Sequence, residues 1–269
     1  MNTLKITIAA FIFLGCVTAG AVEKTEINFA FIGATDGNAY DGVAQGIHEA
    51  NLQGRFLGQN YTLHEFSADN MDAIDPGVFI ALIVATNADD VRQAGNRFKD
   101  HAVLNVAVHD DALRNECSSN LLHVIPSGRM LADAEAQWLQ KSPDAGVTAS
   151  GWHPDFVKFA ARDLNKRFKK RFSRPMDQYA WAGWAAVKMT SDSVARKDLT
   201  DPAGLLQYLK TGLSFDGQKG LDMDFRDTGQ LRQLLLMVDP AGDLVGEAPV
   251  RGVVAPDDVD SLGLASCYN

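Results

Sequence analysis

Short polar stretches follow the five segments of this 269-residue chain that are expected to be strands. An open parallel sheet binds ligands just beyond the carboxyl ends of its strands, because those ends lie along one edge. The sequence therefore predicts a ligand site built from loops that are far apart along the chain. The predicted ligand-binding residues are Asp36, Asn38, Tyr40, Asp69, Thr86, Asn87, His109, Asp110, Asp111 and Ser127.

Four of these residues are aspartates, namely Asp36, Asp69, Asp110 and Asp111, and they are the predicted metal ligands. An edge lined in this way suits a protonated amine or a hard ion such as calcium or a trivalent ion, which prefers oxygen ligands. Asp36 and Asp110 are the strongest candidates. Only one of the adjacent pair Asp110 and Asp111 is expected to ligate, while the other caps a helix or orients its neighbour. The alternative is that these aspartates only form turns and cap helices.

No group of residues in the sequence predicts a catalytic site. The histidines form no H-E-x-x-H pattern, no serine lies in a G-x-S-x-G turn, and the segment 33–37 lacks the G-x-G-x-x-G pattern. The run 222–233 has the aspartates of a calcium loop, but neither its central glycine nor its final glutamate. We therefore expect no enzymatic activity, and the only cofactor that these residues suggest is a calcium or lanthanide ion, bound as cargo by the strand-end aspartates.

Strands that alternate with helices must position the predicted site. The nearly continuous apolar run 78–84 is typical of a strand that is buried on both faces. The alternation predicts an α/β fold, with a doubly wound, mainly parallel sheet forming an amino-terminal lobe over residues 22–142. The expected strands are 26–32, 61–66, 78–84, 103–108 and 121–125, and the expected helices are 40–52, 88–99 and 127–140.

Beyond residue 142 the pattern becomes mainly helical. It predicts a reduced, helix-rich second lobe over residues 143–235, and then a return segment and carboxyl-terminal tail over residues 236–269. The basic run from Lys166 to Arg174 is interpreted as the solvated face of a helix. The expected helices are 154–172, 176–195 and 202–211, and a strand is expected at 231–238.

Residues 1–21 have the pattern of a secretory signal peptide, with Lys5, a short apolar stretch, and small residues before the cleavage position at Ala21. A buried first strand is the alternative. The apolar stretch is shorter than the roughly 20 residues of a membrane span, and no later run is comparable. We therefore expect an exported protein without a membrane span, which would be periplasmic in a Gram-negative host. The formal net charge of −9 argues against nucleic acid as a partner.

Cleavage after Ala21 would remove Cys16 and leave two cysteines, Cys117 and Cys267. An even number of cysteines in an oxidising compartment favours one disulfide. Two unpaired thiols are the alternative. A metal site at either cysteine is disfavoured, because no histidine or second cysteine lies at ligand spacing from it.

Several stretches resemble a known family. One segment resembles the closing part of type I periplasmic solute-binding proteins, the Leu/Ile/Val-binding class. It consists of Phe215-Asp216-Gly217, Gly220, Phe225 and Gly229, followed by the expected strand 231–238 and by Asp239-Pro240-Ala241-Gly242. Further segments resemble the branch found with PQQ-dependent alcohol dehydrogenase systems: 110–114 with Cys117, 120–123 with 126–127 and 130–134, 152–154 with 174–176, 229–233, and 260–263 with Cys267.

The resemblance implies a two-lobed fold that holds a solute between its lobes and delivers it to an ABC permease. The narrower branch is associated with quinoprotein alcohol oxidation and with lanthanide uptake, so a lanthanide or a small solute would be the cargo and a quinoprotein dehydrogenase a further partner. One departure is clear: only about ten residues separate Gln140 from Gly151, where the family has strand–helix units of its second lobe. We therefore expect little closure around a ligand. The alternative function is a periplasmic interaction or accessory protein built on a truncated binding fold.

Overall fold

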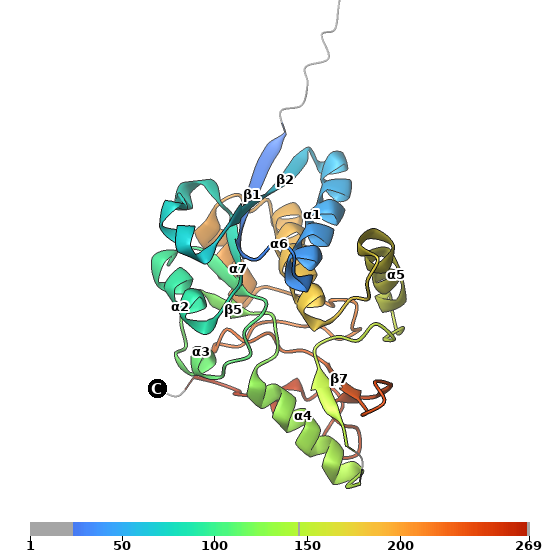
Figure 1. Ribbon diagram of the computed structural model, residues 1–269. Helices are drawn as coiled ribbons and strands as arrows, with labels where there is room; N and C mark the ends of the chain where they lie inside the picture. The colour runs from blue at the N-terminus through green and yellow to red at the C-terminus, as the bar shows by residue number, and fades with distance from the viewer. Residues whose placement is uncertain (1–23, 145, 268–269) are drawn as a thin grey trace, which may run out of the picture.

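The computed structural model describes residues 24–144 and 146–267, so the predicted signal peptide lies outside the described residues. Five parallel strands form the larger sheet in the order β2-β1-β3-β4-β5 (Figure 1). This arrangement confirms the predicted α/β fold with a parallel sheet. The strands are β1 (Thr25–Gly33), β2 (Gln59–Phe66), β3 (Ala81–Ala85), β4 (Ala102–Asn105) and β5 (Leu121–His123).

Helices cover both faces of this sheet, because its strands are apolar on both sides. Phe29 and Phe31 of β1 enter one buried cluster, whereas the alternating residues Ala30 and Ile32 enter another. The first face is covered by α1 (Asn38–Leu57), α6 (Gln178–Lys197) and α7 (Pro202–Thr211), and the second by α2 (Ala88–Arg97), α3 (Ala112–Asn115) and the 3₁₀ turn η1 (Ala68–Ala73).

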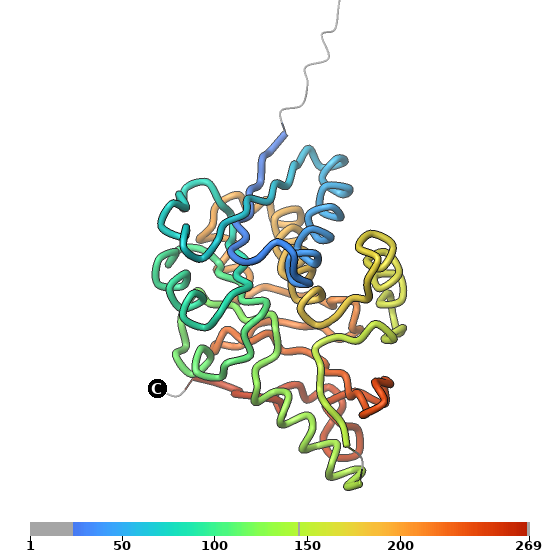
Figure 2. The backbone as a smooth tube through the Cα atoms, in the orientation of Figure 1, coloured from blue at the N-terminus to red at the C-terminus, as the bar shows by residue number. Residues whose placement is uncertain are grey.

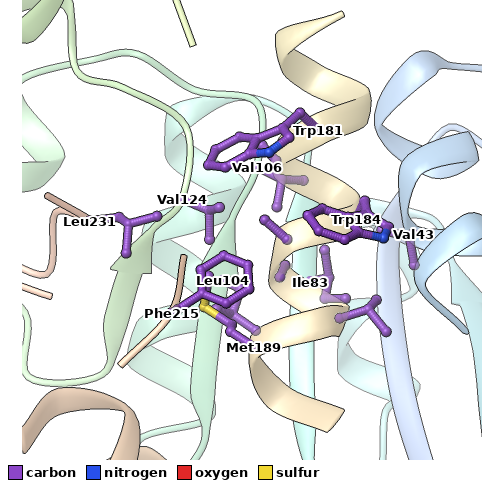
Figure 3. Packing of buried hydrophobic residues seen from close by; sticks show 14 of the residues in the cluster. Val43, Ile83, Leu104, Val106, Val124, Trp181, Trp184, Met189, Phe215 and Leu231 are labelled. Carbon is purple, nitrogen blue, oxygen red and sulfur yellow. The ribbon is translucent and has the colours of Figure 1, made fainter. Parts of the chain in front are cut away.

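Small residues allow α1 and α6 to cross at close range. A Cβ atom added to Gly46 would lie 2.6 Å from Cβ of Val187, and one added to Gly183 would collide with the backbone oxygen of Ala39. The largest side chains of α6 are Trp181 and Trp184, and Trp184 also donates to the carboxylate of Glu49 in α1 at 2.9 Å. Figure 3 shows Trp181 and Trp184 packed in the cluster that contains the strand residues. Both indoles are buried, so α6 is part of the core of the larger sheet.

A second sheet contains three antiparallel strands in the order β6-β7-β8. Helix α4 packs on it through Met130 and Ala134, which contact the cluster that holds Leu235 and Met237. Figure 2 shows the carboxyl-terminal segment, in red, returning beside the green helix α4. These elements are α4 (Gly128–Lys141), β6 (Thr148–Ser150), β7 (Leu235–Val238), β8 (Leu244–Ala248) and the 3₁₀ turn η3 (Val259–Ser261).

The helices of the range 143–235 pack with the larger sheet, since residues of α5 (Ala161–Phe172), α6 and α7 all belong to its first cluster. The boundaries of the predicted second lobe remain a prediction. The predicted helix 154–172 starts only at Ala161, because the side chain of Asn165 takes the carbonyls of Pro154 (2.8 Å) and Phe156 (3.0 Å) that an earlier start would use.

Three other predicted boundaries are wrong for local reasons. The strand expected at 78–84 begins at Ala81, because Asp75 caps a short 3₁₀ turn, η2 (Pro76–Val78), that starts with a proline. The strand expected at 231–238 begins at Leu235. The strand expected at 103–108 ends at Asn105, where the side chain of Asn105 accepts hydrogen bonds from the next backbone amides.

A disulfide bond and a buried arginine hold the carboxyl-terminal tail against the part of the chain that precedes it. The sulfur atoms of Cys117 and Cys267 are 1.98 Å apart, which confirms the predicted disulfide. Arg226 is buried and donates to the carbonyl of Leu262 at 2.7 Å and to the Asp260 carboxylate at 3.0 Å. Within the described ranges, no helix is long and apolar enough to cross a membrane.

Candidate functional site

The carboxyl ends of the parallel strands meet along one edge, which is where the sequence places the ligand site. Val106, just past β4, donates its amide to Val84 of β3 at 3.1 Å. Gly33 ends β1 beside β3, and a Cβ atom there would lie 2.7 Å from the carbonyl oxygen of Ala85. Only glycine permits this approach, so the start of α1 lies next to the loop that follows β3.

Three predicted site residues are helix caps. The Asn87 side chain accepts from the amide of Asp90 at 3.0 Å and begins α2. Ser127 is buried and accepts from the amide of Met130 at 3.1 Å, at the start of α4. Asp111 accepts from the amide of Arg129 at 3.0 Å, in the same first turn of α4. For Asp111 this is the capping role that the sequence left as the alternative.

The four predicted metal ligands do not come together. Asp36, Asp69 and Asp110 are exposed in separate loops, and Asp110 accepts a local hydrogen bond from the amide of Ala112 at 2.9 Å. Over residues 24–144 and 146–267, no three His, Cys, Asp or Glu side chains are grouped closely enough to hold a metal ion. A shared sheet edge therefore does not bring these carboxylates within reach of one ion, and Asp111 already caps α4.

His109 joins the loop after β4 to the beginning of α6. Its Nδ1 lies 2.7 Å from the carbonyl oxygen of Pro126, which can only accept, so Nδ1 carries the proton. Its Nε2 lies 3.3 Å from the hydroxyl of Tyr179, which therefore donates. Burial lowers the pKa of His109, so the imidazole is neutral at pH 7 and holds the Tyr179 ring at the edge.

Two further side-chain pairs fix the start of α1 against its neighbours. Asn38 donates to the carboxylate of Asp177, which also accepts from the amide of Ala180 at 2.9 Å and caps α6. Tyr40 donates its hydroxyl to the carboxylate of Glu65. That hydrogen bond, with burial, raises the pKa of Tyr40 to about 12, so the hydroxyl stays protonated.

Two groups at the edge keep free hydrogen-bonding capacity. The hydroxyl of Thr86, directly after β3, is buried and has no partner among the described residues. Helix α1 begins after Gly37 with no side-chain cap, whereas α2, α4 and α6 are capped by side chains. Unpaired amides at a helix start attract a carboxylate or another anion. The edge therefore offers a hydroxyl and amide donors to a small ligand.

A buried polar network supports the loops of this edge from below. Arg114 is buried and donates to Gln230 Oε1 at 2.9 Å and to the carbonyls of Val108 at 2.8 Å and Ile125 at 3.0 Å. Burial lowers the pKa of Arg114 to about 9, so it remains charged at neutral pH. Gln230 in turn donates to the carbonyl of His123 at 3.0 Å. The network fixes the chain after β4 and β5.

Sequence reasoning missed the residues that hold the edge together: Glu65, Asp177, Tyr179 and the Arg114–Gln230 pair. Asp177 is the second residue of the predicted helix 176–195, and an aspartate at the start of a helix is a common cap, so its capping role had a local signal. Arg114 and Gln230 lie in stretches that resemble the known family. These two residues are structural braces, which indicates that part of the resemblance reflects the scaffold and not a ligand site.

A cavity of about 450 Å³ lies elsewhere, between α6, α7 and the loop 213–222. It is lined by charges of both signs, among them Lys188, Asp192 and Asp222. Asp192 neutralises Lys188 at 2.5 Å. None of the predicted site residues lines this cavity.

No protein-family model matches the chain, and no curated protein matches it. Among solved structures, a substrate-binding protein of an ABC transporter from Desulfitobacterium hafniense, in complex with Leu, is 15% identical, with a TM-score of 0.70 over 83% of this chain and 100% of that chain. This chain has the type I periplasmic binding protein fold.

Two further proteins share this fold. A branched-chain amino acid ABC transporter periplasmic ligand-binding protein from Burkholderia xenovorans is 11% identical, with a TM-score of 0.64 over 88% of this chain and 96% of that chain. A branched-chain amino acid transporter substrate-binding protein from Streptococcus pneumoniae, in complex with isoleucine, is 9% identical, with a TM-score of 0.67 over 83% and 98%. At these identities the likeness concerns the type I fold alone.

Proposed function

We propose that this chain is an exported solute-binding protein that delivers a small ligand to an ABC permease. The observation that carries the proposal is the sheet edge itself. Within a type I fold, it combines the unpartnered hydroxyl of Thr86 with the uncapped start of α1, between loops that the His109–Tyr179 contact holds in place. The polar groups that form this edge are fixed before a ligand arrives, which lowers the entropic cost of binding.

The first ligand class to test is a small α-amino acid. Its carboxylate would accept from the free amides of α1 and from the Thr86 hydroxyl. Leu and isoleucine are the ligands named for two of the structural neighbours, which supports this choice. A periplasmic location is part of the proposal, supported by the signal-peptide pattern of residues 1–21.

The test is calorimetry on the chain from residue 22 onward, titrated with a panel of amino acids and, separately, with calcium and lanthanum. Binding of an amino acid should weaken roughly tenfold in a Thr86→Val variant, because the valine cannot donate to the ligand. The matched control is Thr200→Val, which changes an exposed threonine away from the edge. No heat with any amino acid, or equal weakening in both variants, would exclude the proposed site.

A link to PQQ-dependent alcohol oxidation, with a lanthanide as cargo, is the finer form of the proposal. The sequence resemblance supports it, and the dispersed positions of Asp36, Asp69, Asp110 and Asp111 do not. Lanthanum heat that persists in an Asp36→Asn, Asp110→Asn double variant would show that any ion site lies elsewhere.

The second candidate is an accessory protein that docks on a dehydrogenase or permease. The small size of the three-stranded sheet favours it, because this sheet offers little surface to close over a ligand. Absence of ligand heat combined with a stable complex with either partner would favour this role.

A further inference from the structure

Helix α5 concentrates positive charge on a chain that is otherwise acidic. Residues 161–174 contain seven basic residues and one acidic residue, whereas the whole chain has a formal net charge of −9. Two of the cations are paired, Arg167 with Glu49 at 2.9 Å and Arg174 with Asp41. The other five are exposed, with no ion pair among the described residues: Arg162, Lys166, Lys169, Lys170 and Arg171.

Helix stability accounts for only part of this charge. Lys169, Lys170 and Arg171 lie in the last turn of α5, where cations interact favourably with the helix dipole. Arg162 and Lys166 lie earlier, and Lys166 faces Arg162 and Lys170 at four-residue spacing, where like charges repel. The sequence therefore keeps a cationic face at some cost to the helix.

Two exposed apolar side chains of α1, Leu52 and Phe56, lie on the helix that runs beside α5. Helix α5 runs beside α1 (Figure 1), and a groove of about 320 Å³ lies between them. It is lined by Gln45, His48, Glu49, Leu52, Arg167, Lys170 and Arg171, and its one carboxylate, Glu49, is paired with Arg167. Leu52 is 43% exposed, and Phe56, one turn further along α1, is 90% exposed. The surface therefore combines a cationic rim with protruding apolar side chains.

We propose that this α1–α5 surface docks an acidic segment of a partner protein, in which Asp or Glu side chains flank large apolar ones. The cations would pair with the carboxylates, and Leu52 and Phe56 would contact the apolar residues. A lipid surface fits less well, because the apolar face of α5, with Leu164 and Phe168, is already buried in the core and cannot insert. The surface does not include the sheet edge, so the proposal is independent of the ligand site.

The test uses the chain from residue 22 onward and a fluorescein-labelled acidic peptide, rich in Glu with Leu and Phe at helical spacing. Anisotropy should report binding that a Lys170→Glu, Arg171→Glu double variant weakens roughly tenfold. The matched control, Lys99→Glu with Arg251→Glu, makes the same change in net charge at two exposed sites away from the groove. Phe56→Ser, which leaves the charge unchanged, should weaken binding several-fold, and circular dichroism should show that every variant is folded.

Equal binding by the two double variants would overturn the proposal, as would equal binding of a peptide in which Ser replaces Leu and Phe. Two further measurements address other occupants. Binding to phosphatidylglycerol vesicles that the groove variant loses, without peptide binding, would assign the surface to a membrane. Concentration-dependent self-association that the same variant loses would assign it to a second copy of the chain, and either result would replace the proposal.

Discussion

The five-stranded and three-stranded sheets obtain their cores in different ways. The larger sheet is buried between two helical layers, and its strands contribute to a separate apolar cluster on each face. The smaller sheet has α4 on one face and a much smaller cluster. Its return segment is held by ties to other parts of the chain, such as the Cys117–Cys267 disulfide and the buried Arg226.

Because of this difference, we expect the ligand site and the least stable elements to lie in different parts of the molecule. The predicted ligand edge belongs to the larger sheet, whose faces are buried mainly by its own helical layers, although Leu236 of β7 also enters the first cluster. The smaller sheet, by contrast, depends on contacts that are made by the last residues of the chain. The elements around the five-stranded sheet can thus contact a ligand by themselves. The three-stranded sheet is expected to lose stability first when the disulfide or the Arg226 contacts are removed.

The largest expected effect comes from cutting the covalent tie. Replacing Cys117 and Cys267 with Ser opens a loop with a sequence separation of 150 residues. On the chain-entropy model this loses roughly 5 kcal/mol of stability, because the unfolded chain gains freedom. Urea denaturation of the variant and the oxidised protein measures the loss. Hydrogen exchange should show that amides of β7 and β8 lose more protection than those of β1 and β3, and equal losses would contradict the comparison.

The larger sheet could be predicted because its signals are local. Each strand is a short apolar run, and the segment that forms α1 has apolar residues at helical spacing. The smaller sheet could not be predicted in the same way. Its strands β6 and β7 pair across more than eighty residues of sequence, and β6 has only three residues. No local period identifies such a pairing.

The candidate site shows a different limit. An aspartate after a strand can ligate an ion or cap a helix, since both uses need the same oxygen atoms. The sequence gives no distances between such aspartates, so only the folded chain shows that, among the described residues, no three acidic, histidine or cysteine side chains are grouped around one ion. Tyr179 and Asp177 were missed as edge residues because they come from a helix that follows the strand-end loops by many residues.

Mild acidification should lower the stability of the protein by a smaller amount, and the cause is two histidines in or next to the five-stranded sheet. Burial lowers the pKa of His109 and lowers that of His123 well below the ordinary value near 6.5. The unfolded chain therefore takes up these protons at a higher pH than the folded chain. This stabilisation is complete above about pH 6.5 and is lost as the pH falls below it, so urea midpoints should decrease between pH 7.5 and 5.5.

A His109→Asn variant should show a shallower dependence on pH over the same range, because one of the two imidazoles whose pKa burial lowers is gone. The control is His48→Asn, which makes the same substitution at an exposed histidine. An identical slope in wild type and in His109→Asn would show that the contact of His109 with Pro126 and Tyr179 does not contribute to the pH dependence.

The smallest expected effect is the change of shape on ligand binding. Strand β7 belongs to both regions: Leu236 is buried in the core of the larger sheet, while Leu235 and Met237 face α4. Gln233, just before β7, also donates to the carbonyl of Val124 at 2.8 Å. A hinge movement of the smaller sheet would have to expose Leu236 or break this bond. We therefore expect small-angle scattering to give the same radius of gyration with and without saturating ligand, under conditions in which a two-lobed leucine-binding protein compacts on adding leucine. A clear decrease for this chain would show that the smaller sheet moves as a complete lobe does.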